Sequence, residues 1–137
     1  MSQDNSIDTV RVKKDYYKSG ALRREIPFVN GKRHGIEKTY YETGAICYEV
    51  PLVNGQRHGI AKRYYESGAL EQETPYVNGN IHGVTKDYYR SGALWYETPY
   101  VNGMRHGIER GYDKDKTSVH CLSLYDKGRE VLSLYNV

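Results

Sequence analysis

Side chains that could do chemistry recur along this chain at a fixed step of 24 residues. Histidine, each time followed by glycine, stands at His34, His58, His82 and His106. Glutamate recurs with the same step at Glu25, Glu49, Glu73 and Glu97. Imidazoles gathered in space could bind a metal ion, and paired carboxylates could serve as general acid and general base. Whether either set can act depends on the elements that carry it.

Whole segments recur together with these residues. Each copy contains Tyr-Tyr, then Ser/Thr-Gly-Ala, then Pro, then Asn-Gly, then His-Gly. The copies occupy residues 11–34, 35–58, 59–82 and 83–106. Self-similarity at a fixed period is the signature of a repeat architecture.

Each copy carries two turn signals, Tyr-x-Ser/Thr-Gly-Ala and Asn-Gly, and the runs between them favour strands. Asn-Gly is a strong hairpin signal because both residues tolerate positive φ. Residues 35–41 and 45–53 are rich in Ile, Val, Thr and Tyr, which suit strands. Proline at 51 and its equivalents excludes a helix and predicts weak or bulged pairing at that point. We therefore expect an all-β fold, an elongated antiparallel β-hairpin meander in a single twisted, solenoid-like sheet.

Composition is typical of a thin architecture. The chain has 137 residues, enough for one domain, and 38% of them are apolar. Its aromatic residues are 15 Tyr, one Trp and one Phe, so most large side chains carry a polar tip. The net charge of +3 permits a polyanionic partner but does not demand one. No run of 18 apolar residues is present, and the polar segment 1–10 lacks an apolar signal core, which predicts a cytoplasmic protein.

Three regions are predicted. Residues 1–10 form an N-terminal cap segment, residues 11–106 the four repeats, and residues 107–137 a degenerate repeat followed by a C-terminal capping hairpin. Terminal units of repeat arrays are atypical because they must protect an exposed edge. A partner-binding role for the same tail is the alternative.

The repeat geometry argues against a metal centre. Equivalent residues lie two strands apart, about 9.5 Å, whereas donor atoms on one zinc ion lie within about 4 Å of each other. We therefore expect no metal, and expect each histidine to close its own hairpin turn by hydrogen bonding. The glutamates are expected to pair with lysines on the neighbouring strand, namely Lys14, Lys38, Lys62 and Lys86.

Nucleophilic catalysis is not indicated either. Cys47 occupies a slot that holds Arg, Glu or Trp in the other copies. His120 and Cys121 are neighbours in the sequence, so strand alternation predicts that they point to opposite faces. We expect neither a catalytic residue nor a cofactor.

The combination of Tyr-Tyr-x-Ser/Thr-Gly-Ala with Asn-Gly-x-x-His-Gly at this step resembles the MORN-like repeat. More narrowly, it is similar to the bacterial variant found in the YwqK-type antitoxin family. The resemblance covers residues 11–107 and implies a repeat sheet that binds proteins or, in eukaryotic relatives, membranes. It implies no catalysis, and it suggests an antitoxin or immunity role in which a small protein neutralises a toxin domain.

Positions that change between copies are the candidates for specificity, since a uniform scaffold does not require them to vary. The variable slots include those of Asp15, Arg23, Arg24 and Lys32 and their equivalents in later copies. The partner-binding residues expected from them are Trp95, Tyr96, Met104, Arg105, Glu71 and Arg63. Tryptophan and tyrosine are favoured interface anchors. Neutral drift at solvated positions and a buried Trp95 are the competing interpretations.

The functional hypothesis is a non-catalytic antitoxin or immunity protein that forms a tight complex with a cognate toxin protein, a nuclease or other intracellular toxin domain, and covers its active site. The alternative is a MORN-type scaffold that binds other proteins or an anionic membrane surface. Binding of single-stranded nucleic acid is a weaker third possibility, because 17 acidic residues are spread along the chain.

Overall fold

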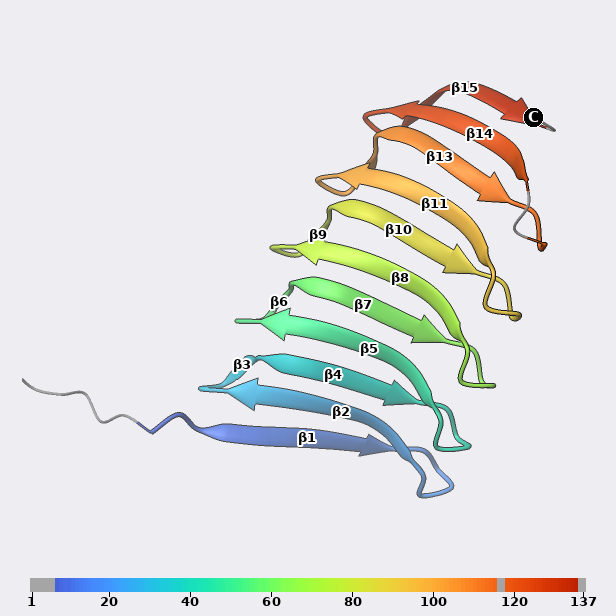
Figure 1. The fold of residues 1–137 in the computed structure, drawn as a ribbon. Helices are drawn as coiled ribbons and strands as arrows, with labels where there is room; N and C mark the ends of the chain where they lie inside the picture. The colour runs from blue at the N-terminus through green and yellow to red at the C-terminus, as the bar shows by residue number, and fades with distance from the viewer. Residues whose placement is uncertain (1–6, 116–117, 136–137) are drawn as a thin grey trace, which may run out of the picture.

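The computed structural model describes residues 7–115 and 118–135, and these form strands and turns of one open antiparallel sheet (Figure 1). The sheet is elongated and twisted, with hairpin following hairpin along its length. The all-β meander expected from the sequence is confirmed. Residues 1–6 of the predicted N-terminal cap segment lie outside the described residues.

The strands fall into two kinds, long strands that form the body of the sheet and two-residue strands beside the Asn-Gly turns. The long strands are β1 (Val10–Tyr16), β2 (Leu22–Val29), β4 (Gly35–Tyr40), β5 (Ile46–Val53), β7 (Gly59–Tyr64), β8 (Leu70–Val77), β10 (Gly83–Tyr88), β11 (Leu94–Val101), β13 (Gly107–Tyr112), β14 (Val119–Asp126) and β15 (Arg129–Tyr135). The short strands are β3 (Lys32–Arg33), β6 (Gln56–Arg57), β9 (Asn80–Ile81) and β12 (Met104–Arg105). The long strands pair in chain order, and each short strand pairs with the long strand that precedes it.

The Asn-Gly turn is built from two residues with positive φ. Asn54 has φ 49° and Gly55 has φ 86°, which match the right-handed twist of the strands they join. The turn closes a short ladder of two residue pairs, and the chain then bends at Gly59, where φ is 111°. Only glycine adopts that backbone geometry readily. Gly59 also packs against Pro51, because a Cβ there would lie 3.1 Å from the proline Cγ.

The ladder of backbone pairs between neighbouring hairpins is short, and it ends before the proline of each repeat. Within a repeat, β4 and β5 pair over their whole length, whereas β5 and β7 share only the pairs Tyr48–Arg63 and Glu49–Lys62. Pro51 lacks an N–H to donate and lies beyond these pairs. The weak pairing predicted near proline is thus present. A bulge expected there lies instead at Cys47, between the pairs Thr39–Tyr48 and Tyr40–Ile46.

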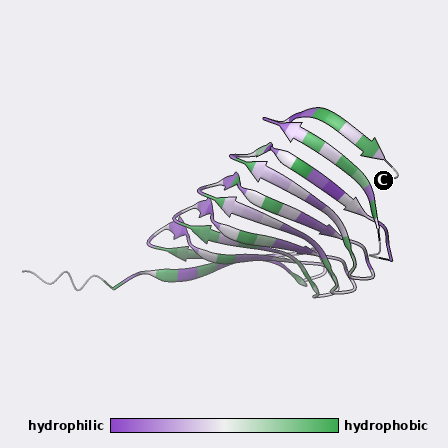
Figure 2. Ribbon diagram, turned by 45° about the horizontal axis from the view of Figure 1, so that its top comes forward, coloured by the Kyte–Doolittle hydropathy of each residue, from purple (hydrophilic) through white to green (hydrophobic). Residues whose placement is uncertain are grey.

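Burial is confined to a thin band of small or medium side chains, because no second layer covers the sheet. The buried hydrophobic cluster consists of Val50, Leu52 and Ala61, with Tyr48 and Tyr76 packed against it. Further along the sheet the buried residues include four polar ones, Thr74, Thr85, Thr98 and Ser123, together with Ala93 and Cys121. The ribbon coloured by hydropathy shows this mixed character along the sheet (Figure 2). Long flanking side chains, not a facing layer, exclude water from this band.

Substituting Gly59 by alanine tests how far the repeat depends on this glycine. Gly59→Ala is expected to lower the free energy of unfolding by about 2 kcal/mol, because it strains the backbone and drives a methyl group against Pro51. Gly55→Ala is the matched control, since its φ is also positive but nothing lies within 4 Å of the added Cβ. Denaturant unfolding measures both. Equal losses in the two variants would contradict the packing role of Gly59.

Candidate protein-binding surface

The side chains that stay constant between repeats bond one repeat to the next. The second tyrosine of each Tyr-Tyr pair donates its hydroxyl hydrogen to the backbone carbonyl of the tyrosine 23 residues later. These bonds are Tyr17 to Tyr40 and Tyr41 to Tyr64 at 2.6 Å, Tyr65 to Tyr88 at 2.7 Å, and Tyr89 to Tyr112 at 2.9 Å. These hydroxyls are part-buried and therefore engaged within the fold.

From the second repeat on, the first tyrosine of the pair bonds in the opposite direction, to the glutamate of the preceding repeat, and Tyr112 takes this place after the fourth repeat. Tyr64 donates to Glu49 at 2.8 Å, and the same bond joins Tyr40 to Glu25, Tyr88 to Glu73 and Tyr112 to Glu97. Burial, followed by the bond to glutamate, raises the pKa of Tyr40, Tyr64 and Tyr88 to about 12. The expected lysines do lie directly opposite these glutamates in the register, but the hydrogen-bond donor to the glutamate is a tyrosine hydroxyl in all four repeats. Lys14 does lie 3.3 Å from Glu25.

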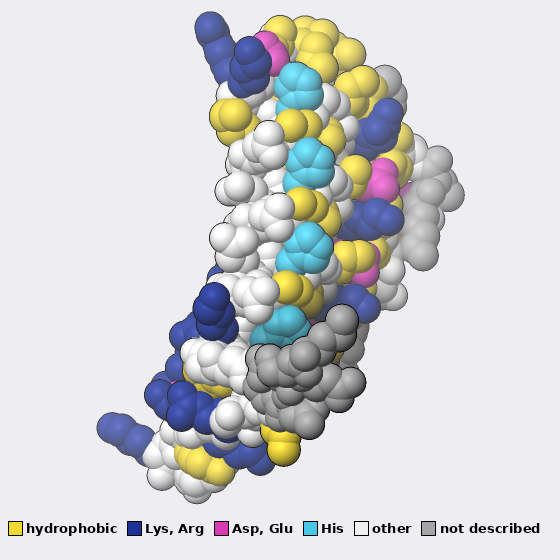
Figure 3. All heavy atoms as spheres, turned by 90° about the vertical axis from the view of Figure 1, so that its left-hand side faces the viewer, with side chains coloured by type: hydrophobic (Ala, Val, Ile, Leu, Met, Phe, Trp, Pro, Cys, Tyr) yellow, Lys and Arg dark blue, Asp and Glu magenta, His cyan; other side chains and the backbone are white. Residues whose placement is uncertain are grey.

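The histidines form a column across the hairpins, at the end of the sheet where the Asn-Gly turns lie, and this column is the line of cyan side chains in Figure 3. Each Nδ1 accepts from a backbone N–H one repeat further on, at Asn54, Asn78, Asn102 and Lys127, over 3.3 to 3.4 Å. Each histidine does close its own turn by hydrogen bonding, but through its backbone and not its ring. The N–H of His34 donates to the Pro27 carbonyl at 3.1 Å, while the imidazole reaches the next repeat.

The tyrosine–glutamate bonds predict a loss of stability in alkali. The pKa of these tyrosines is about 12 in the folded chain and about 10 in an unfolded one, so the stabilisation is complete below about pH 10 and is lost as the pH rises toward 12. Denaturant unfolding at a series of alkaline pH values measures the decline. Tyr64→Phe, which cannot ionise, is expected to reduce the slope. A slope that Tyr64→Phe leaves unchanged would contradict the assignment.

The side chains that vary between repeats gather mainly on one face of the sheet. Residues directly opposite each other in neighbouring strands point to the same face. Tyr96 is opposite both Asp87 and Gly111, and in the previous repeat Gln72 is opposite both Arg63 and Asp87. We call this side the variable face. Two rows of residues run across the strands on this face. The first row consists of Asp15, Arg24, Thr39, Tyr48, Arg63, Gln72, Asp87, Tyr96 and Gly111. The second row consists of Lys13, Ile26, Glu37, Val50, Ala61, Thr74, Thr85, Thr98 and Glu109.

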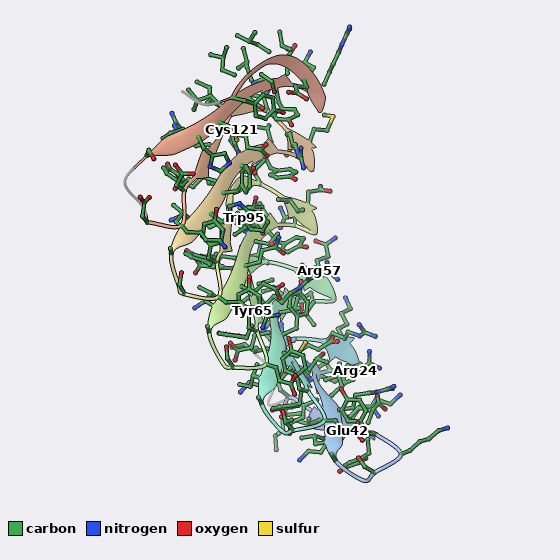
Figure 4. All side chains as sticks on the ribbon, turned by 90° about the vertical axis from the view of Figure 1, so that its right-hand side faces the viewer. Arg24, Glu42, Arg57, Tyr65, Trp95 and Cys121 are labelled. Atoms are coloured by element: carbon green, nitrogen blue, oxygen red, sulfur yellow. The ribbon has the colours of Figure 1, made fainter. Side chains whose placement is uncertain are left out.

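The β-bulge adds one more variable side chain beside this face in each repeat. Tyr96 pairs with Asp87 and Leu94 pairs with Tyr88, so Trp95 is the extra residue between them. Trp95 is 41% exposed, stacks on Tyr89 with ring centroids 5.2 Å apart and lies 5.3 Å from the ring of Tyr96. Figure 4 shows Trp95 projecting from the sheet one repeat away from Cys121. The indole is therefore a partly exposed aromatic side chain and not a core residue.

A surface cavity of about 290 Å³ opens beside Trp95. We call it the Trp95 cavity, and its lining consists of Asp87, Trp95, Tyr96, Thr98, Arg105 and Glu109. Three of the residues expected from the sequence, Trp95, Tyr96 and Arg105, are thus brought together. Two aromatic rings and three charged groups around one hollow suit recognition of an amphipathic side chain from another protein.

The charged groups of the Trp95 cavity are two carboxylates, Asp87 and Glu109, and one guanidinium, Arg105. Burial raises the pKa of Asp87, and the nearby Glu109 adds to the rise, while Gln72 donates to Asp87 at 2.7 Å and opposes it. Glu109 accepts from Thr98 at 2.7 Å and lies 3.9 Å from Arg105. A basic or hydrogen-bond-donating group of a partner would relieve the repulsion between the two acids.

The remaining predicted residues occupy different places. Arg63 is exposed on the variable face, 6.0 Å from the ring centroid of Tyr48. Glu71 holds the bulge position of its repeat, equivalent to Trp95. Met104 is not in the Trp95 cavity. It lines a second hollow of about 380 Å³ at the Asn-Gly end of the sheet, with Val101, Asn102, His106 and Lys127.

The placement of His120 and Cys121 on opposite faces is wrong. His120 is a bulge residue, because Gly111 pairs with Cys121 and Tyr112 pairs with Val119. Both side chains consequently approach the Tyr96 hydroxyl, the imidazole Nε2 at 3.4 Å and the Cys121 thiol at 3.7 Å. The absence of a side chain at Gly111 makes room, since a Cβ there would lie 2.6 Å from Cys121 Sγ. Cys121 is only 3% exposed.

Sequence reasoning missed Thr98 and Glu109. The position of Glu109 is occupied in successive copies by Lys13, Glu37, Ala61, Thr85 and Glu109. This position varies as much as the positions from which the partner-binding residues were predicted. Comparing every position across the copies, instead of the most conspicuous ones, would have found it. The same comparison would have found Thr98, because the equivalent residues of the first two copies are Ile26 and Val50.

A single-layered sheet of near-identical hairpins, with one constant and one variable face, defines a β-repeat protein. The family model of the MORN repeat variant matches residues 12–30, 33–54, 57–78 and 81–102 of the sequence, which is more than half of the chain. The chain belongs to this family. MORN repeats are consistent with a protein-binding or membrane-binding scaffold. No curated protein matches the chain.

Two further observations concern the described residues. Within 7–115 and 118–135, no helix is long and apolar enough to cross a bilayer. In the same residues, no group of three or more His, Cys, Asp or Glu side chains comes together in a way that could hold a metal ion.

Proposed function

We propose that this chain is a non-catalytic protein-binding module of the antitoxin or immunity type, which holds one toxin domain against the variable face and covers its active site. The supporting observation is the division between the two sets of residues. Constant polar side chains bond to the neighbouring repeat, whereas the variable side chains share the other face. Some of them, such as Thr98, are buried, and others, such as Trp95 and Arg105, are exposed around the Trp95 cavity. A surface whose residues differ from repeat to repeat fits one irregular partner.

The centre of the proposed interface is the aromatic pair formed by Trp95 and Tyr96. Such residues carry a large share of binding energy when water is excluded around them. Asp87 and Glu109 lie beside them and would accept hydrogen bonds from a basic group of the toxin. Arg63, one repeat earlier on the variable face, extends the charged surface toward the N-terminal half.

Affinity purification of the tagged full chain from its native host, followed by an activity assay of the recovered protein, tests the proposal. We expect a one-to-one complex, and we expect an equimolar amount of the chain to abolish the partner's toxic activity. Recovery of no protein, together with binding to anionic liposomes that is reversed by salt, would instead favour a membrane scaffold.

Truncation of the tryptophan tests the site within that complex. Trp95→Ala is expected to weaken binding by about 2 kcal/mol, roughly thirtyfold in Kd, because it removes the exposed anchor of the Trp95 cavity. Tyr16→Ala is the matched control, an exposed aromatic on the first strand, and should leave binding unchanged. Titration calorimetry measures both, and circular dichroism verifies that the sheet persists. Equal affinity of Trp95→Ala and the parent chain would contradict the assigned site.

A further inference from the structure

The last strand of the sheet presents an apolar edge. In the described part of the chain, β15 is paired on one side only, with β14. Its side chains Val131, Leu132, Leu134 and Tyr135 are all exposed. An edge strand offers a row of unpaired N–H and C=O groups, and natural proteins usually protect such edges with charge or proline. β15 has its only charges, Arg129 and Glu130, at its first two positions.

The apolar character extends from the edge onto the constant face, the side opposite the variable face. Within the repeats this face carries lysine–glutamate pairs such as Lys86–Glu97, but at the end of the sheet the same row holds the pair Leu122–Leu134. Together with Ile108, Leu124 and Leu132, these leucines line a hollow of about 180 Å³. Figure 2 shows the hydrophobic colour on the last strands. A terminal repeat that acts as a cap is expected to be polar on its outer side.

The opposite edge of the sheet is different. β1 carries Arg11, Lys13, Lys14 and Asp15 within seven residues. Pairing β15 with the β1 of another chain would place these cations beside leucines and would leave further edges free, so that the assembly would grow without closing. The two edges therefore do not suit each other.

We propose that β15 pairs antiparallel with the β15 of a second copy of this chain, forming a two-fold dimer in which the two sheets continue as one. Another strand can pair with the free N–H and C=O groups of an edge strand. A two-fold contact between two identical edges pairs both of them at once and leaves neither β15 free for a further copy. Antiparallel pairing also keeps the two Arg129 side chains at opposite ends, whereas parallel pairing would bring these like charges together.

Pairing centred on Leu132 sets Arg129 of one copy opposite Tyr135 of the other. The chain already uses this contact internally, since the Arg105 guanidinium lies 5.1 Å from the ring centroid of Tyr125, and that of Arg57 lies 5.2 Å from the ring centroid of Tyr76. Directly opposed residues share a face, so the variable faces of both copies would lie on the same side of the joined sheet. The proposal does not depend on the function of that face.

Sedimentation equilibrium of the full chain tests the proposal, with an expected mass of twice 15.8 kDa. Leu132→Lys places a charge in the contact and should raise the dimer Kd at least about tenfold. Val12→Lys is the matched control on the other edge, because Val12 is 51% exposed and Leu132 is 54% exposed. Ile60→Lys, in the middle of the constant face, is the second control. Both controls should remain dimeric.

Other outcomes overturn the proposal. A parent chain that stays monomeric up to its solubility limit would do so, and so would dissociation caused by Val12→Lys or Ile60→Lys but not by Leu132→Lys. Dissociation by Val12→Lys would mean that the copies pair through β1, and dissociation by Ile60→Lys would mean that the sheets pack face to face. Should Leu132→Lys fail to fold, hydrogen exchange on the parent chain decides, since amides of β15 must gain protection as concentration rises.

Discussion

Hydrogen bonds from tyrosine hydroxyls to the main chain of the following repeat are the interactions on which this structure depends. A single sheet has no second layer, and the ladder between hairpins is only two residue pairs long, so backbone pairing alone connects the repeats weakly. The tyrosines add one bond forward and one bond back at each junction. Because their rings are apolar and their tips are polar, they exclude water and satisfy a carbonyl at the same time.

This arrangement explains why composition and fold agree. A chain with 15 tyrosines cannot form a core from which polar atoms are absent, and it has no need of one when the tyrosine hydroxyls at the junctions between repeats have fixed partners. The constant residues are occupied with one another along the length of the sheet. The variable face is consequently free to change from one repeat to the next without disturbing the bonds that hold the sheet together, and the Trp95 cavity shows the result at one position.

Much of the fold could be predicted from the sequence because turn chemistry is local. Asn54-Gly55 required positive φ, and Pro51 limited pairing, as the residue types alone imply. The bulge at Cys47 could not be predicted, since it follows from the register between strands and not from a residue type. The equivalent bulges in later hairpins decided whether His120 and Cys121 share a face, and whether Trp95 lies beside the face that carries Tyr96.

The partners of polar side chains were also beyond sequence reasoning. Glu49 was assigned to a lysine on the adjacent strand, and Lys38 and Lys62 are indeed directly opposite it in the register, but the hydroxyl of Tyr64 donates the hydrogen bond that Glu49 accepts. Opposite charges are visible in a sequence, whereas the reach of a tyrosine from the following hairpin depends on strand twist. Within the candidate site, the aromatic residues were found by their type, whereas Glu109 is distinguished only by the variation of its position between copies.

The bonds between repeats join only adjacent copies, and this has a consequence for how such a chain can evolve. Duplicating or deleting one whole unit of 24 residues restores the same donor beside the same acceptor at the new junction, so the sheet can change length in a single genetic step. The surface available to a partner would then grow in increments of one hairpin, and each new hairpin would begin as a copy free to diverge. Length and specificity can thus be selected separately in this architecture.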